Sequence, residues 1–172
     1  TVVAPDRERT AISHAITLQM PLRVDVISHS GKKAYAVSGT PADCIKLAIT
    51  RLLVEKPDLV IAGINPGANV GVNINYSGTF AAAREATLYG IPAFAVSINS
   101  KKPVHYGEAA DFVDSLVERN IAADLPQGTL LNVNFPDLPR ERIKGVRISR
   151  QNMDQLDEFI ERRIDPRDRA YY

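Results

Sequence analysis

Tryptophan is absent from this 172-residue sequence, and cysteine occurs once, as Cys44. A single cysteine excludes an internal disulfide bond and a cysteine-based zinc site. Aromatic residues make up only 6% and the formal net charge is +1, so neither base stacking nor a nucleic-acid polymer is indicated as a partner. No apolar run has membrane-spanning length and no signal peptide is recognisable, so we expect no membrane partner and a cytoplasmic location.

The sequence is rich enough in hydrophobic residues, at 45%, to build a core, and its length is typical of one domain. Strands are expected at residues 1–5, 16–18, 22–28, 33–39, 58–65, 93–99, 129–135 and 146–151. Helices are expected from 40 to 53, from 78 to 89 and from 105 to 120. This alternation predicts an α/β fold with a mostly parallel sheet and helices on both faces.

Both ends of the sequence are typical of a longer chain. It begins with TVVAP, a strand pattern without an initiator methionine, and it ends on two tyrosines that would favour burial. We therefore expect one α/β domain over residues 1–172, incomplete at both ends. Residues 152–172 mix aromatic and charged side chains and are expected to start an oligomerisation arm.

A helix start is recognisable at GTPAD. Thr40 fits the N-cap, Pro41 fits the first turn, and Asp43 fits the acidic position that bonds back to the N-cap. We therefore expect Asp43 to cap the helix, and a catalytic role for it is the less favoured alternative.

The most informative stretch is AGINPGANVGVNINYSGTFAAARE, residues 62–85. A buried strand leads into a loop rich in glycine and asparagine, and a helix follows at Ser77-Gly78-Thr79. The free N–H groups and the positive dipole end of that helix are suited to a phosphate group. Ser77 is also a good N-cap without any ligand, so the pattern alone leaves an ordinary turn as an equal alternative.

Neutral oxygen atoms are expected near the carboxyl edge of the sheet. Asn65 ends one strand, and Thr10 lies in the loop that follows another, so both can reach the same edge. Oxygen ligands suit Mg²⁺ or Mn²⁺, but carboxylates normally carry the charge. Asp6 and Glu8 are flanked by arginines and are expected to form surface ion pairs. Either no metal binds here, or its carboxylates lie outside this chain.

These residues occur in stretches that resemble the SurE survival proteins, a family of metal-dependent nucleotidases. The matching stretches are VVAPDRERTAISHAITL, SGTPADCIKLA, PDLVIAGINPGANVGVNINYSGTFAAAREA, LLNVNFPDLP and DPRDRAYY. The combination of APDR, GIN-x-G-x-N and YSGT-x-x-AA is specific. The resemblance implies a Rossmann-like α/β fold and hydrolysis of nucleoside 5′- or 3′-monophosphates, with polyphosphate as a further substrate. A non-catalytic phosphate-binding module and a general phosphatase are the alternatives.

The resemblance also implies roles for individual residues. Thr10 and Asn65 match metal-ligand positions for one Mg²⁺ or Mn²⁺ per subunit, although the family usually has serine where Thr10 stands. Asn69 and Ser77-Gly78-Thr79 match the segment around the phosphate. The family's paired aspartates come from an NDDG motif that this sequence lacks, so no catalytic residue is expected in this chain. A homodimer or homotetramer is implied.

Overall fold

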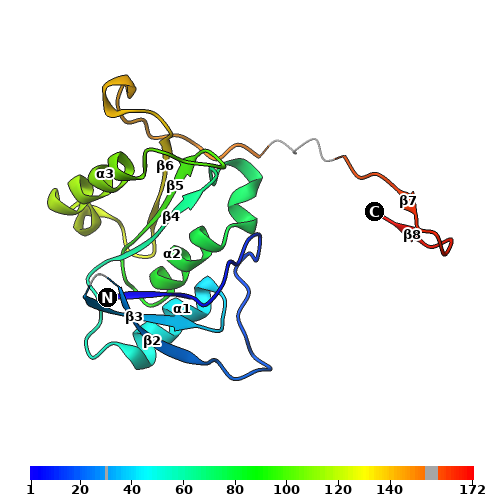
Figure 1. Ribbon diagram of the computed structural model, residues 1–172. Helices are drawn as coiled ribbons and strands as arrows, with labels where there is room; N and C mark the ends of the chain where they lie inside the picture. The colour runs from blue at the N-terminus through cyan, green and yellow to red at the C-terminus, as the bar shows by residue number, and fades with distance from the viewer. Residues whose placement is uncertain (30, 154–158) are drawn as a thin grey trace.

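The computed structural model describes residues 1–29, 31–153 and 159–172, and it contains two three-stranded sheets and a separate hairpin (Figure 1). The first sheet has the order β1-β3-β2 and contains β1 (Val2–Pro5), β2 (Val24–His29) and β3 (Lys32–Val37). In it, β1 is parallel to β3, and β2 is antiparallel. The second sheet is fully parallel, with the order β4-β5-β6, and contains β4 (Val60–Pro66), β5 (Ala93–Asn99) and β6 (Leu130–Pro136).

The helices cover both faces of the β4-β5-β6 sheet, as the alternating pattern predicts. They are α1 (Pro41–Leu47), continued by a π-helix over Ala48–Leu52, α2 (Gly78–Leu88) and α3 (Tyr106–Glu118). Short 3₁₀ helices follow at Gly71–Tyr76, Ile121–Asp124 and Arg140–Arg142.

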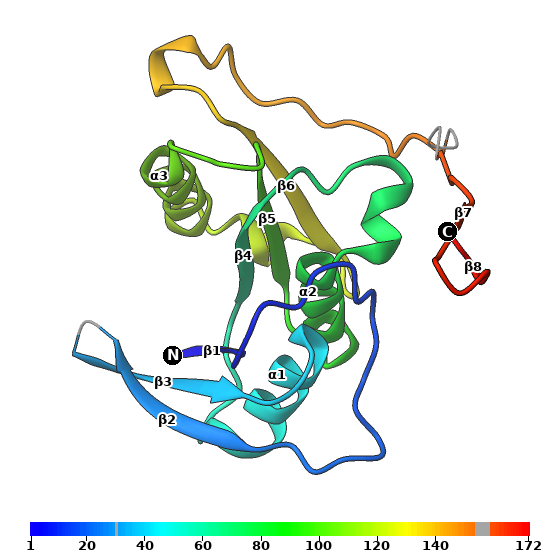
Figure 2. The ribbon, with the colours of Figure 1, turned by 45° about the vertical axis from the view of Figure 1, so that its right-hand side comes forward.

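Two apolar clusters define the two faces of this sheet. The alanines of α2 pack against alanines of β4 and β5, with side chains of α1 at the margin. On the other face, Val113 of α3 packs against Phe94 and Val96 of β5. Figures 1 and 2 both show α3 on one side of the sheet and α2 on the other. None of the helices in the described part of the chain is long and apolar enough to cross a membrane.

Two expected strands are wrong, because neither segment pairs with another strand in the described part of the chain. Residues 16–18 are held by a helix instead: the Thr17 backbone N–H and hydroxyl donate to the Asp43 carboxylate at 3.0 and 2.6 Å. Residues 146–151 run across the surface, with Val146 and Ile148 exposed. These residues are β-branched, as is typical of strands, but here they are neither buried nor paired.

The start of α1 is confirmed as a capping box. Asp43 N–H donates to the Thr40 hydroxyl at 3.0 Å, and the Asp43 carboxylate accepts from Thr40 N–H at 2.9 Å. Burial raises the pKa of this carboxyl, but the hydrogen bonds from Thr17 and Thr40 outweigh it and hold the pKa below its ordinary value. Asp43 thus joins the helix to Thr17, a link that local sequence does not indicate.

A β-bulge near the end of β4 determines how this strand leaves the sheet. The register shifts between Ala62, opposite Ala95, and Asn65, opposite Ser97. Gly63 within the bulge has φ of +117°, and a Cβ atom there would lie 2.2 Å from the Val96 carbonyl oxygen. Only glycine fits at this close approach, so the bulge that delivers Asn65 to the sheet edge depends on it.

The last described element is a two-stranded antiparallel hairpin of β7 (Arg163–Ile164) and β8 (Ala170–Tyr171). It lies apart from the sheets and helices in both views (Figures 1 and 2).

Candidate functional site

The structure brings the loop of residues 6–14, which follows β1, against the start of α2. Ser13 makes the contact: its N–H donates to the Tyr76 carbonyl at 2.9 Å, and its hydroxyl donates to the Asn75 carbonyl at 2.7 Å. A Cβ atom at Gly78 would lie 3.5 Å from the Arg9 carbonyl oxygen and 3.4 Å from Cγ2 of Ile12, which are ordinary contact distances between neighbouring segments. The loop that carries Thr10 and the predicted phosphate segment are therefore neighbours.

The N-terminus of α2 keeps free hydrogen-bond donors. Phe80 N–H donates to the Ser77 hydroxyl at 3.0 Å, and Ala81 N–H donates to the Ser77 carbonyl at 3.0 Å. The backbone N–H groups of Gly78 and Thr79 have no hydrogen-bond acceptor in the described part of the chain. Two free donors at the positive end of an eleven-residue helix are suited to binding an anion.

Arg9 lies in the loop beside this helix end. Its Nε atom is buried and has no hydrogen-bond acceptor among the described residues. An unpaired guanidinium N–H is costly to bury, and an anion close to it would lower that cost through its charge. Arg9 therefore strengthens the case for an anion at this edge.

The Asn65 side chain is oriented by the backbone that follows it. Its Nδ2 donates to the Gly67 carbonyl at 2.8 Å and to the Pro66 carbonyl at 3.2 Å. Two carbonyl neighbours identify this atom as the nitrogen, so the orientation of the amide is fixed. Among the described residues, Oδ1 has no hydrogen-bond partner, which leaves it available as a ligand.

Thr10 offers a second oxygen. The residue is exposed, and its hydroxyl donates to Glu8 Oε1 at 2.8 Å, so the proton is engaged while the oxygen can still act as a ligand. Asp6 forms an ion pair with Arg7 at 3.3 Å, in agreement with the surface role expected for the first of the two loop acids, whereas Glu8 accepts from Thr10.

The donor set at this edge fits a hard divalent cation only in part. Thr10 and Asn65 supply neutral oxygen atoms of the type that Mg²⁺ and Mn²⁺ bind. Across the described ranges, no three His, Cys, Asp or Glu side chains come together as a metal cluster. The negative charge that such a cation needs is therefore not supplied by these residues.

Asn69 lies in a buried network and not on the loop surface. It is 6% exposed, and its Nδ2 donates to the Ser97 hydroxyl of β5 at 2.6 Å. Its N–H donates to Asn134 Oδ1 at 2.8 Å, and its carbonyl accepts from the amides of Asn132 and Asn134 of β6. These bonds fasten the loop after β4 to the neighbouring strands.

Two histidine–carboxylate pairs were not expected from the sequence. His14 Nε2 lies 2.7 Å from Oε2 of Glu85, a buried residue of α2, and His105 Nδ1 lies 2.8 Å from Asp137 Oδ1 after β6. Burial raises the Asp137 pKa, but hydrogen bonds, the largest from His105, lower it to about 2. Glu85 could have been noticed as an acid on a helix face otherwise made of alanines.

Taken together, the start of α2, which is suited to an anion, lies beside the loop of Thr10, and Asn65 lies at the carboxyl end of β4 in the parallel sheet. This arrangement is typical of phosphate-binding α/β proteins. The family model described as "Survival protein SurE" matches residues 1–158. The chain therefore belongs to the SurE family.

Relatives of known sequence and structure cover nearly the whole chain. It is 56% identical to 5′-nucleotidase SurE of Desulfatibacillum aliphaticivorans, over 99% of this chain and 68% of the relative. It is 48% identical to 5′-nucleotidase SurE of Syntrophobacter fumaroxidans, over 100% of this chain and 69% of the relative. The crystal structure of SurE from Aquifex aeolicus is similar, with a TM-score of 0.83 and 36% identity, over 99% of this chain and 69% of that one.

Proposed function

We propose that this chain is the core of a metal-dependent nucleotidase that releases phosphate from nucleoside 5′-monophosphates, with 3′-monophosphates and polyphosphate as further substrates. The observation that carries the proposal is the pair of free N–H groups of Gly78 and Thr79, which lie beside the Thr10 loop. The names of the relatives, 5′-nucleotidase SurE at 56% and 48% identity, support a nucleotide as the molecule that brings the phosphate.

In this proposal the Ser77–Thr79 segment binds the phosphate group. The N–H groups of Gly78 and Thr79 donate to its oxygens, and the helix dipole stabilises its charge. Asn69 is proposed as a further contact through its second amide hydrogen, since the first is engaged by Ser97. Held by a helix end and not by a mobile loop, the phosphate keeps one orientation during hydrolysis.

Thr10 and Asn65 are proposed to hold one Mg²⁺ or Mn²⁺ per subunit. Such a cation, when bound, neutralises charge that develops on phosphate oxygens. The amide orientation of Asn65 supports this assignment, since its nitrogen donates to the Pro66 and Gly67 carbonyls and its oxygen accepts no hydrogen bond from the described residues. We assign the paired carboxylates to residues outside this sequence, and with them the catalytic role.

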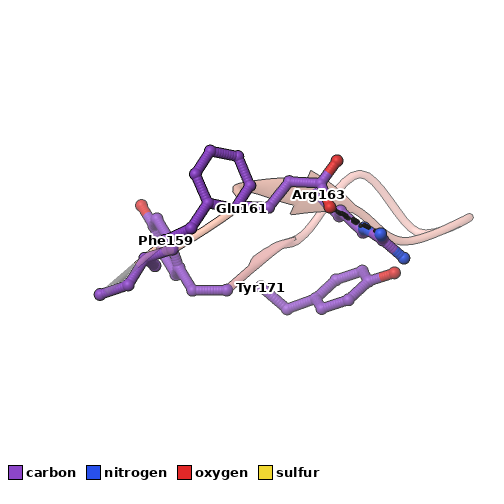
Figure 3. A pocket seen from close by; sticks show the side chains of 6 residues that line it. Phe159, Glu161, Arg163 and Tyr171 are labelled. Atoms are coloured by element: carbon purple, nitrogen blue, oxygen red, sulfur yellow. Dashed lines mark hydrogen bonds and ion pairs between the residues drawn. The ribbon is translucent and has the colours of Figure 1, made fainter. Parts of the chain in front are cut away.

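The carboxy-terminal hairpin is proposed to join copies into a homodimer or homotetramer. Figure 3 shows a pocket at this hairpin, lined by Phe159, Ile160, Glu161, Arg163, Tyr171 and Tyr172. Phe159 is 89% exposed and Tyr172 is 79% exposed. Apolar side chains this exposed favour contact with another protein surface, and we propose that a second copy of the chain provides it. The proposed location is the cytoplasm.

A substrate panel tests the function with the full-length protein. We expect phosphate release from nucleoside 5′-monophosphates to exceed release from sugar phosphates of the same charge, because the nucleoside adds binding energy. Equal rates on all phosphomonoesters would instead identify a general phosphatase. Nucleotide binding by calorimetry without any phosphate release would identify a non-catalytic binding module.

A further inference from the structure

The pair formed by His14 and Glu85 links two parts of the site that lie 71 residues apart in the sequence. His14 ends the loop that carries Thr10, and Glu85 lies in α2, the helix that begins at the proposed phosphate segment. The Nε2 to Oε2 distance is 2.7 Å, and the Glu85 side chain is 8% exposed against 23% for His14. Among the described residues, the hydrogen-bond partner of the Glu85 carboxylate is His14.

Stability alone does not explain a carboxylate at this position. The surrounding face of α2 consists of buried alanines, among them Ala81, Ala82 and Ala86. Removing a carboxylate from water costs free energy that a single partner rarely returns in full. In some proteins, buried pairs of this kind fix one arrangement of two elements.

The contacts around His14 fix the loop in two directions. Ser13 holds it to the Asn75 and Tyr76 carbonyls, just before the start of α2. His14 holds it to Glu85, which lies six residues beyond Thr79 and hence about 9 Å further along the helix. These two attachments, one just before α2 and one within it, restrict both sliding and turning of the loop.

We propose that His14 and Glu85 are positioning residues for nucleotide hydrolysis: they hold the Thr10 loop against α2, so that the cation and phosphate subsites keep a fixed separation. This inference rests on the proposed function. The pair touches neither group itself. It determines where the Thr10 oxygen stands relative to the free N–H groups of Gly78 and Thr79.

The test uses the full-length protein and the variants His14→Ala, Glu85→Gln and Glu85→Asp. Mn²⁺ binding is measured directly by electron paramagnetic resonance, next to KM, kcat and thermal melting. His14→Ala is expected to weaken Mn²⁺ binding about 10- to 100-fold, the effect of losing support behind a metal ligand. Glu85→Gln should retain most of the affinity, because its amide oxygen still accepts from His14.

His105→Ala is the matched control. It removes a histidine from a carboxylate pair of similar length, 2.8 Å, that lies outside the Thr10 loop. The His105→Ala variant should have a lower melting temperature. Its Mn²⁺ affinity should stay within about twofold of wild type, a much smaller change than the one expected for His14→Ala. Glu85→Asp keeps the charge but shortens the side chain, and it should weaken Mn²⁺ binding even where His14→Ala is too unstable to purify.

Unchanged Mn²⁺ affinity in both His14→Ala and Glu85→Asp would overturn the inference and leave the pair a structural contact. If Glu85→Asp is the only variant of the two that can be purified, its unchanged affinity has the same meaning. Failure of the proposed function would be seen elsewhere, as a wild-type protein that releases no phosphate from any nucleotide.

Discussion

Asn65→Ala in the full-length protein is expected to lower nucleotide hydrolysis at least about tenfold, the lower end for disturbing a metal site. The substitution removes Oδ1, which has no hydrogen-bond partner in the part of the chain that the structure describes, together with the donor to the Gly67 carbonyl at 2.8 Å. Added metal should recover part of the activity, because a weakened site fills at higher concentration.

Asn65→Asp separates the two contributions of this side chain. It keeps an oxygen ligand and loses the Nδ2 donor to Pro66 and Gly67. If the metal role is correct, Asn65→Asp should retain more activity than Asn65→Ala at saturating metal. If Asn65 only stabilises the turn, both variants should lose thermal stability, with and without metal, and excess metal should restore neither.

Gly63→Ala is expected to lower the free energy of unfolding by about 3 kcal/mol or more, from backbone strain together with overpacking. The added Cβ would lie 2.2 Å from the Val96 carbonyl oxygen, at a residue with φ of +117°. The obstructing atom is backbone of the central strand β5 and cannot move aside as a side chain can. Urea unfolding of the full-length protein measures the loss.

Gly67→Ala is the control for this substitution. Gly67 also has a positive φ, +100°, but a Cβ atom there would meet nothing within 4 Å. Gly67→Ala should lower the free energy of unfolding by only about 1–2 kcal/mol, because a side chain at a positive φ is strained even without a clash. Equal losses in the two variants would show that the contact with Val96 relaxes and that the bulge tolerates a side chain.

Features of the fold that depend on local pattern were predictable from the sequence. The capping box of Thr40 and Asp43 and the N-cap role of Ser77 involve residues three positions apart. The strands at 16–18 and 146–151 were predicted wrongly, since composition alone cannot show whether a partner strand is present. Thr17 bonds to Asp43 from 26 residues away, and Ile148 is fully exposed.

The candidate site also combines features set by local sequence with contacts between distant segments. The helix start that we propose for the phosphate is local in sequence, so the N-cap Ser77 could be predicted in advance. The burial of Asn69 depends on Ser97 and Asn134, which come from two other strands. Glu85 finds His14 only because the loop after β1 folds over α2. Contacts between distant segments determine these positions, and one sequence does not show them.

We propose that this member of the SurE family uses a divalent cation to release phosphate from nucleoside 5′-monophosphates. The most direct measurement is phosphate release from adenosine 5′-monophosphate by the full-length protein, before chelation, after exhaustive chelation, and after Mg²⁺ or Mn²⁺ is added back. We predict that chelation abolishes the release and that one of the two cations restores it. Undiminished turnover in the chelated protein would contradict the account.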